Sequence, residues 1–389
     1  MPLRYLTAGE SHGPALTAIL EGMPAGLPLT ENQIAADLAR RQTGTGTGDR
    51  MAIEKDHAQI LAGVMEGVTT GAPIALLIMN KDHANWKGKA VTAYTTPRPG
   101  HADLAAVVKY GYSDVRPSLE RASARETALR VAVGAICRGF LDSFGITVGG
   151  YVSSIGGHVA QLDNLSFQDR VSHARSSDVQ CPDSEAAAKM NVAIGKAHAS
   201  GETLGGIIEV IAQGVPIGLG SHVNWDRRLD SRLAQAILGV PAIKGIEIGS
   251  AFENTAKPGT RVHDAILMGT HELMRKTNAC GGIEGGISNG QTLWLRAAMK
   301  PIPTTRKGQE TVDLATGKPV RTFYERSDVC PVPRAVVVLE AVVSIVLADA
   351  LLEKLGGDSF SEMKPRFDAL RRAVPDDIHM TGKPHVFWP

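Results

Sequence analysis

The sequence is poor in aromatic residues, in closely spaced cysteines and in net charge. Aromatic residues make up 5% of the 389 residues, and the formal net charge is +1. Because no excess of positive charge is present, composition gives no reason to expect a nucleic-acid partner. The four cysteines, Cys137, Cys181, Cys280 and Cys330, form no C-x-x-C pair, which argues against a zinc site and a disulfide framework. They predict reduced thiols in a cytoplasmic protein.

The sequence also lacks the long uncharged apolar runs of membrane proteins. The first residues, "MPLRYLTAGES", have no apolar core of the signal-peptide kind. The most apolar stretch, residues 335–352, contains Glu340 and Asp349 and therefore predicts a buried helix rather than a membrane span. No linker or low-complexity segment divides the chain, so we expect one domain over residues 1–389 and no membrane partner.

Helix and strand signals follow one another without a regular βαβ rhythm. Capping boxes at Thr30 and Ser123 open two predicted helices, and an alanine-rich stretch and a long apolar run predict two more. The predicted helices span residues 31–42, 123–144, 183–199 and 333–356. Strand-like runs occupy residues 72–79, 146–155, 205–219 and 291–299. This mixture predicts an α+β fold rather than a doubly wound sheet.

Two weak echoes within the sequence bear on its internal organisation. Residues 69–76 are similar to residues 212–219, and each of two long apolar helices follows an arginine-containing loop. A duplicated half-domain explains both echoes, and convergent packing explains them nearly as well. Both interpretations stay open at the level of sequence.

Residues 9–13, Gly-Glu-Ser-His-Gly, match the G-x-S-x-G pattern of serine hydrolases. That pattern places its serine on a sharp turn between a strand and a helix, in a sheet with several earlier strands. Only eight residues precede the match, and the residues that follow, "PALTAILEG", do not predict a helix. A hydrolase with Ser11 as nucleophile is therefore the weaker alternative, although such a polar run is unusual for a core strand.

Arginines gather in two loops beside predicted helices. Residues 40–50 combine Arg40, Arg41 and Arg50 with three spaced glycines, a composition that suits anion binding and a flexible solvated loop about equally. Residues 116–125 carry three arginines immediately before a predicted helix N-terminus. Because three guanidiniums at the positive end of a helix dipole need a counter-charge, this loop favours an anion site over salt bridges to its neighbouring glutamates.

Two further loops carry residues suited to ligand binding. Arg98 and His101 stand in a proline-fixed turn, a pattern that by itself favours a surface histidine. A glycine-rich stretch around Gly285 and a proline-fixed loop entered by Lys300 fit backbone wrapped around a flat or phosphorylated ligand, and they fit tight turns as well.

The remaining signals concern metals and polyanions. The carboxylates Glu10 and Asp328 lie among serine, histidine and arginine residues, but no pair has metal-ligand spacing, so no metal site is predicted.

A module that binds RNA through the basic loops is a third functional alternative. It is disfavoured because residues 40–50 and 116–125 contain no aromatic side chain for base stacking.

Three long motifs, in this order, resemble the signatures of the chorismate synthase family. They are "GESHGPALTAILEGMP" at 9–24, "ERASARETALRVAVGAI" at 120–136 and "RSDVCPVPRAVVVLEAV" at 326–342. The similarity also takes in "RPGHAD", "GGIEGGISNGQ" and "KPIPT". It covers nearly the whole chain, and only roughly the last thirty residues lack a recognisable match.

The resemblance implies a flavoenzyme of the shikimate pathway that converts 5-enolpyruvylshikimate 3-phosphate to chorismate and phosphate by a 1,4-anti elimination. The family requires reduced FMN, although the reaction has no net redox change. The implied fold is a β-α-β sandwich with helices between antiparallel sheets and internal pseudo-symmetry, assembled as a homotetramer. No dedicated nicotinamide domain is recognisable, so NADPH is expected only as an indirect reductant.

The resemblance also implies site residues, position by position. The implied catalytic residues are His12 as acid toward the departing phosphate, His101 at the reduced flavin, and Asp328 in proton removal. The implied substrate-binding residues are Arg41, Arg50, Arg98 and Arg125. The implied FMN-binding residues are Arg121, Ala122, Ser123, Gln235, Ala236, Gly285, Lys300, Pro301, Ile302, Pro303, Thr304 and Arg326. Thr47 and Ala122 depart from the usual arginine and serine, so one anion contact lacks its usual residue and one hydroxyl near the flavin is missing.

Overall fold

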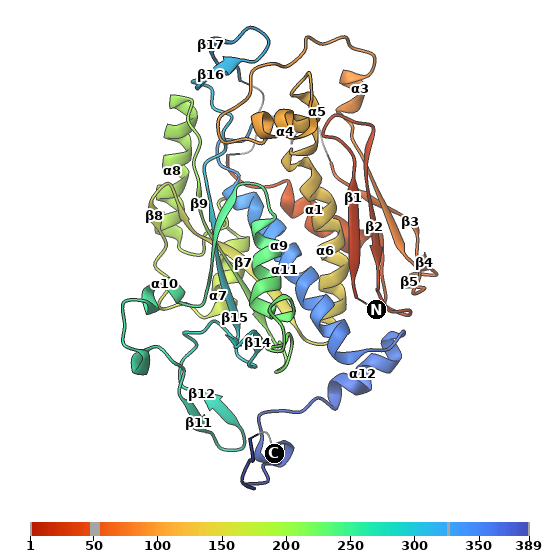
Figure 1. Ribbon diagram of the computed structural model, residues 1–389, viewed down its shortest axis with the longest axis vertical. Helices are drawn as coiled ribbons and strands as arrows, with labels where there is room; N and C mark the ends of the chain where they lie inside the picture. The colour runs from red at the N-terminus through yellow and green to blue at the C-terminus, as the bar shows by residue number, and fades with distance from the viewer. Residues whose placement is uncertain (1, 47–54, 325–326, 388–389) are drawn as a thin grey trace.

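The computed structural model describes residues 2–46, 55–324 and 327–387. In these residues helices combine with antiparallel sheets, which confirms the predicted α+β class. Figure 1 shows the two larger sheets on opposite sides of a group of long helices. The main cluster of buried apolar side chains takes its members from Leu3 to Met363.

The first sheet is built from the N-terminal part of the chain. Its antiparallel strands, in spatial order, are β1 (Arg4–Ala8), β2 (Ala15–Glu21), β6 (Ile74–Met79) and β3 (Ala58–Ala62). Along β2 buried and exposed residues alternate, with Leu16, Ala18 and Leu20 facing the core. The sequence signals predicted β6 and missed the other strands of this sheet.

The second sheet comes from the middle of the chain. Its antiparallel strands, in spatial order, are β10 (Ile243–Ile248), β15 (Leu293–Met299), β9 (Gly206–Gln213), β7 (Thr147–Ile155) and β8 (His158–Val159). The strand predicted over residues 205–219 ends early, at Gln213. Gly214 there has a φ of 74°, and a Cβ on it would lie 2.3 Å from the carbonyl oxygen of Gly145, so only glycine fits this turn.

Short hairpins and helices complete the described part of the chain. The hairpins pair β4 (Val64–Met65) with β5 (Val68–Thr69), β11 (Ile266–Met268) with β12 (Leu273–Arg275), β13 (Ile283–Glu284) with β14 (Ile287–Ser288), and β16 (Glu310–Asp313) with β17 (Lys318–Arg321). The helices are α1 (Glu31–Arg41), α3 (His83–Trp86), α4 (Asp103–Tyr110), α5 (Arg116–Arg121), α6 (Thr127–Asp142), α7 (Phe167–Arg175), α8 (Ser184–Ser200), α9 (Leu229–Leu238), α10 (Ala251–Asn254), α11 (Val332–Leu355) and α12 (Phe360–Asp368).

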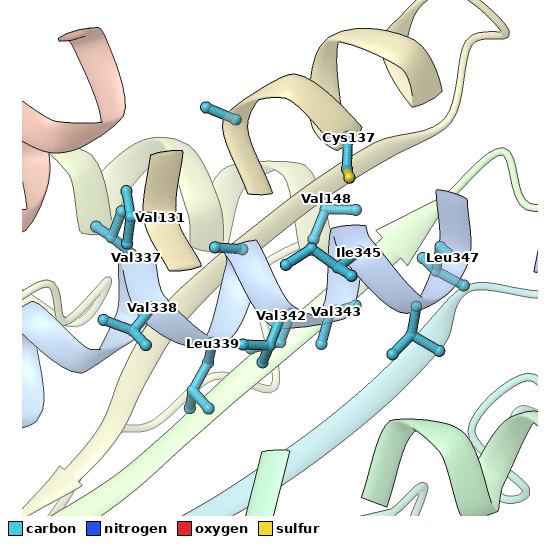
Figure 2. Close-up of a cluster of buried hydrophobic side chains, with 14 of the residues drawn as sticks. Val131, Cys137, Val148, Val337, Val338, Leu339, Val342, Val343, Ile345 and Leu347 are labelled. Carbon is cyan, nitrogen blue, oxygen red and sulfur yellow. The ribbon is translucent and has the colours of Figure 1, made fainter. Parts of the chain in front are cut away.

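Helices α6 and α11 pack on each other in the middle of the core. α6 contacts β1, β2 and β6 of the first sheet and also β7 of the second, and α11 contacts β7 and β9, so the pair joins the two sheets. Figure 2 shows part of the cluster, with valine and leucine side chains along α11. α11 is long and apolar enough to cross a membrane, but nearly all of its side chains are buried inside the protein. This confirms the interpretation of residues 335–352 as a buried helix.

The four predicted helices are confirmed, with small shifts at their ends. Thr30 and Gln33 form the predicted capping box at the start of α1. Ser123 instead caps a 3-10 turn, Ala124–Glu126, by accepting a hydrogen bond from the backbone N–H of Arg125, and α6 follows that turn.

The two sequence echoes have different structural outcomes. Residues 69–76 lead into β6, whereas residues 212–219 lead out of β9, so this similarity does not mark equivalent elements. The two arginine-containing loops do hold matching positions, because each precedes one of the packed helices α6 and α11. Internal pseudo-symmetry stays a prediction.

The residues after α11 place α12 against the end of α6. The rings of Phe360 and Phe367 lie 5.5 Å and 4.9 Å from the ring of Phe144, between centroids. Lys364 Nζ lies 5.5 Å from the Phe144 ring centroid. The segment that lacks a family motif therefore covers an apolar end of the core.

The four cysteines give a first testable prediction. All four are free thiols, and burial raises the pKa of Cys330 to about 12 and that of Cys181 and of Cys280 to about 11. Burial raises the pKa of Cys137 as well. Because the thiolate is the reactive form, the native protein should react very slowly with DTNB at about pH 8. Four thiols should react after denaturation, and rapid reaction of the native protein would contradict this burial.

Candidate active site

A cavity of about 1290 Å³ opens where α6 and α11 begin. Its walls include β1, the β1–β2 connection, the turn at residues 98–102 and parts of residues 119–126, 238–244, 300–304 and 327–334. The three motifs of the family resemblance therefore meet at one place, although they lie far apart in the sequence. In Figure 1 this is the end of the helix group next to α5.

The described residues that line the cavity are strongly biased toward positive charge. Eight of them are cations and two are carboxylates. The cations are Arg41, Arg98, Arg121, Arg125, Arg130, Lys244, Lys300 and Arg334, and the carboxylates are Glu126 and Asp328. Because the whole chain has a net charge of only +1, this is a local concentration. A cleft with such a charge distribution attracts anionic ligands.

His12 lies in the β1–β2 connection and is held by Glu120 at the end of α5. The distance from His12 Nδ1 to Glu120 Oε1 is 2.7 Å, and the backbone N–H of His12 donates to Oε2 at 2.7 Å. Burial raises the pKa of Glu120, but the hydrogen bonds from His12 outweigh it and leave the pKa below its ordinary value. Glu120 is therefore ionised at neutral pH, and it fixes the orientation of the imidazole.

The helix α3 covers another side of the His12 ring. The Trp86 ring centroid lies 4.5 Å from that of His12, and Trp86 Nε1–H donates to Asp82 at 3.2 Å. Asp82 is buried, and its Oδ2 lies 3.9 Å from His12 Nε2. The imidazole thus sits between two carboxylates and under an indole, in a position with little freedom to rotate.

His101 also lies beside a carboxylate. Its Nδ1 contacts Oδ1 of Asp103, which is fully buried at the first residue of α4. Arg98 donates Nε–H and Nη2–H to the same carboxylate at 2.8 Å and 3.1 Å. The prediction of a surface histidine from the turn alone is wrong, because Asp103 draws both Arg98 and His101 against the cavity wall.

Asp103 gives a prediction about acid stability. Burial raises the pKa of Asp103, but hydrogen bonds from His101 and Arg98 outweigh it and hold the pKa well below its ordinary value. An unfolded aspartate titrates near 3.9, so this carboxylate stabilises the fold above that pH and loses its contribution as the pH falls through the folded pKa. Asp103→Asn should be less stable at neutral pH and lose less stability on acidification. Urea unfolding between neutral pH and about pH 3 tests this, and an unchanged pH slope in the variant would contradict it.

Arg41 and Arg125 share one buried carboxylate. Asp56 Oδ1 lies 2.6 Å from Arg125 Nη1, and its Oδ2 lies 3.4 Å from Arg41 Nη1. Arg41 also donates to Thr127 Oγ1 at 3.0 Å and to the carbonyl of Ala124 at 2.9 Å. Asp56 therefore holds both guanidiniums at the cavity wall.

The electrostatic surroundings of Arg41 favour an added anion. Burial, followed by the neighbouring guanidiniums of Arg334 and Arg125, lowers the pKa of Arg41 to about 9. This value is still above neutral pH, so Arg41 keeps its charge. A phosphate or carboxylate beside it would relieve the repulsion among the three cations.

Arg121 and Arg125 contact groups other than their neighbouring glutamates. Arg121 donates to the carbonyl oxygens of Thr7 and Gly9 at 2.9 Å and 3.3 Å, which ties α5 to β1. Glu126 accepts from Arg130 and from Thr7 Oγ1. These contacts favour the anion-site interpretation of this loop over the salt-bridge alternative.

The described part of the glycine-rich loop after α1 is packed against the protein. Thr45 N–H donates to the carbonyl of Asp178 at 2.9 Å, and the Gly46 carbonyl accepts from Val329 N–H at 3.0 Å. A Cβ on Gly46 would lie 3.1 Å from the carbonyl oxygen of Cys330. Up to Gly46 the loop is therefore an anchored support for Arg41 and not a solvated segment.

Asp328 links the third motif to the first arginine loop. It is an ion-pair partner of Arg334, whose Nη1 contacts Asp328 Oδ2. Arg334 Nε–H also donates to the backbone carbonyl of Arg41 at 3.1 Å. The start of α11 thus holds a carboxylate and a cation at the cavity.

Most of the predicted site residues line this one cavity. They are His12, Arg41, Arg98, His101, Arg121, Ala122, Ser123, Arg125, Lys300, Ile302, Pro303, Thr304 and Asp328. Four others are not among its lining residues. They are Pro301, which follows β15, Gln235 and Ala236, which lie on α9, and Gly285, which lies in the β13–β14 turn. Arg50, Arg326 and Thr47 lie outside the described residues. Glu10 is exposed and does not line the cavity. The roles assigned to these residues stay predictions.

Sequence reasoning missed the groups that hold the site residues in place. They are the carboxylates Asp56, Asp103 and Glu120, together with Trp86 and Arg334. Asp103 and Glu120 both belong to quoted motifs, but Glu120 was interpreted only as a neighbour of arginines. Asp56, Glu120 and Trp86 have their partners in distant segments, so spacing does not identify them, whereas Asp103 and Arg334 lie within six residues of theirs.

The hydrolase alternative is wrong. Residues 9–13 connect two antiparallel strands of a hairpin and not a strand to a helix. Gly9 has a φ of 116°, and a Cβ on it would lie 2.6 Å from the Ala15 carbonyl oxygen, so glycine closes this connection. Ser11 is buried and accepts a hydrogen bond from Ser123 Oγ at 3.2 Å.

Comparison with known proteins decides the family. A family model described as chorismate synthase matches residues 3–352. The chain belongs to the chorismate synthase family. The chorismate synthase of Geobacter metallireducens is 51% identical over 383 residues, covering 94% of this chain and 98% of that protein. That of Desulforamulus reducens is 53% identical over 383 residues, covering 96% of this chain and 99% of that protein.

A solved structure agrees with this assignment. It is described as a crystal structure of chorismate synthase, and it matches this chorismate synthase family member with a TM-score of 0.78 and 44% sequence identity. The match covers 95% of this chain and 97% of that one. The resemblance inferred from three motifs is confirmed, and with it the prediction that the chain is an enzyme of this lyase family.

Proposed function

We propose that this protein converts 5-enolpyruvylshikimate 3-phosphate to chorismate and phosphate, with reduced FMN as its cofactor. The observation that carries the proposal is the charge of the cavity, in which the described lining residues include eight cations and two carboxylates. The substrate carries a phosphate and two carboxylates, and guanidinium groups bind both kinds of anion through paired hydrogen bonds.

The reaction is a 1,4-anti elimination. The C–O bond to phosphate breaks, phosphate leaves with that electron pair, and a proton leaves the carbon at the far end of the rearranging unit. Arg41, Arg98 and Arg125 hold the anionic groups of the substrate. His12 gives a proton to the departing phosphate, and Asp328 assists removal of the substrate proton. Because all of these groups are held by their own partners, they need little rearrangement during the reaction.

The chemistry of the cavity residues fits a flavin. Arg121 and Lys300 offer cationic groups for its phosphate, Ser123 offers a hydroxyl, and Ile302 and Pro303 offer apolar surface for a flat ring. The chemistry that a bound reduced FMN would supply is a transient electron donation to the substrate, which would let the elimination proceed without net redox change. His101 has its Nδ1 directed to Asp103 and can offer a proton from Nε2 to the reduced flavin.

We further infer the setting in which this enzyme works. The absence of a nicotinamide-binding pattern in the sequence supports an external source of reduced flavin, with NADPH as an indirect reductant. The four free thiols support a cytoplasmic location. Exposed apolar side chains on β11, such as Ile266 and Met268, support assembly into the homotetramer implied by the family. The position of the packed helices α6 and α11 between the two larger sheets supports the sandwich arrangement and its internal pseudo-symmetry.

The proposal is tested by phosphate release without oxygen. With chemically reduced FMN, the purified protein should release phosphate and form chorismate in equal amounts. Oxidised FMN, or no flavin, should give no release, and NADPH with oxidised FMN should give none until a flavin reductase is added. No phosphate release with reduced FMN would sink the proposal.

A further inference from the structure

We propose that Glu120 is a positioning residue that fixes the tautomer of His12, with the proton on Nδ1 toward Glu120 and with Nε2 as the nitrogen that exchanges a proton with the substrate. This inference rests on the proposed function, and it adds a residue to which the family comparison assigns no role.

Both oxygens of the Glu120 carboxylate are committed to His12. Oε1 lies 2.7 Å from the ring Nδ1, and Oε2 accepts the backbone N–H at 2.7 Å. Backbone and ring are therefore held by one group, and the ring cannot turn without breaking a short, charge-assisted hydrogen bond. A carboxylate only accepts hydrogen bonds, so the nitrogen that faces it must carry the proton.

The charge of Glu120 supports this assignment. Its pKa lies below the ordinary value because the hydrogen bonds from His12 outweigh the effect of burial. Glu120 is itself fixed, because the Glu120 carbonyl accepts the Ser11 backbone N–H at 3.3 Å.

The other ring nitrogen of His12, Nε2, does not face Glu120. His12 Nε2 lies 3.9 Å from Asp82 Oδ2, too far for a hydrogen bond with that carboxylate. Trp86 covers the ring and anchors its own N–H on Asp82, so Asp82 is engaged with the indole. His12 lines the cavity, and because its Nδ1 faces Glu120, Nε2 is the ring nitrogen that we assign to the departing phosphate.

Replacing Glu120 by glutamine makes a sharp prediction. The glutamine side chain has one accepting oxygen and one donating NH2, whereas the site needs two acceptors. If the oxygen keeps the backbone N–H of His12, the NH2 faces Nδ1, and the ring must then carry its proton on Nε2. Glu120→Gln should therefore reverse the tautomer of neutral His12.

The chain offers a matched control. Glu31 contacts His57 Nε2 at 2.9 Å and accepts the backbone N–H of Ile60 at 2.9 Å, so it also holds a histidine and a backbone N–H. His57 is exposed, and neither residue lines the cavity. Glu31→Gln should change the resonances of His57 alone and leave phosphate release at the wild-type rate.

The test combines nitrogen NMR of ring-labelled histidines with anaerobic kinetics, with His12 assigned by the signal lost in His12→Gln. We expect Nδ1 of neutral His12 to carry the proton in the wild type and Nε2 to carry it in Glu120→Gln. The kcat for phosphate release should fall about 10- to 100-fold in Glu120→Gln with KM nearly unchanged.

Each outcome bears on the assignment. A proton on Nε2 in the wild type, or wild-type turnover in Glu120→Gln, would overturn it, and the wild-type spectrum decides even if the variant does not fold. The NMR readout needs no substrate, so absence of phosphate release in the wild type would count against the proposed function and not against the tautomer.

Discussion

The His12→Ala variant is expected to release phosphate about 100-fold more slowly than the wild type, or slower still. His12 is held by Glu120 on one side and covered by Trp86 on another, so under the proposed function the alanine variant loses a proton donor that was already oriented. The His101→Ala variant is expected to lose a similar factor, because Asp103 orients that ring at the same cavity. Anaerobic phosphate release with reduced FMN measures both effects.

A control separates this effect from the general loss of a histidine. His158 is exposed on β8, outside the cavity, and His158→Ala should keep the wild-type rate. Equilibrium binding of FMN should remain measurable in His12→Ala, because the proposed role of His12 is toward the substrate and not toward the flavin. Wild-type rates in His12→Ala and His101→Ala would remove both histidines from the chemistry.

The Gly134→Ala variant is expected to lose about 2 kcal/mol or more of its free energy of unfolding. A Cβ on Gly134 would lie 2.3 Å from Ala341 Cβ and 2.5 Å from Ala341 Cα. The obstacle is the backbone of α11, which cannot rotate aside as a flexible side chain would. The two helices must separate, and this disturbs the packing that joins the sheets.

Helix α6 also contains a glycine whose replacement by alanine should stabilise the protein. Gly139 also lies in α6, and a Cβ on it would meet no heavy atom within 4 Å. Gly139→Ala should therefore stabilise the protein by about 0.5–1 kcal/mol, because alanine loses less entropy in a helix. Chemical denaturation of both variants tests the pair. Equal stabilities for the two would mean that α6 and α11 are not in the close contact described.

The helices were predictable because their signals are local. The capping box at Thr30 and the buried run of α11 each depend on residues within a few turns of one another. Most strands of the first sheet were not predicted, because their sequence signal is weaker and their pairing is not local. β2 has a clear two-residue alternation, but small alanines occupy two of its seven positions and weaken the apolar signal. Its strand character depends on pairing with β1 and β6, which lie on either side of it.

The residues that line the cavity could be predicted from the sequence, but most of the residues that hold them in place could not. Clustered arginines and the family motifs pointed to the residues that line the cavity, because those residues occur within short patterns. The pairing of Asp56 with Arg125, and of Glu120 with His12, joins residues 69 and 108 positions apart. No local pattern encodes such pairs. They are set by the packing of α6 and α11 against the two sheets.

The most direct measurement is the crystal structure of this protein with FMN and 5-enolpyruvylshikimate 3-phosphate, grown without oxygen. We predict that both ligands occupy the cavity at the start of α6 and α11. The substrate phosphate should lie within hydrogen-bond reach of His12, with the guanidiniums of Arg41 and Arg125 on the anionic groups. Ligands bound elsewhere, or a substrate phosphate remote from His12, would contradict the account.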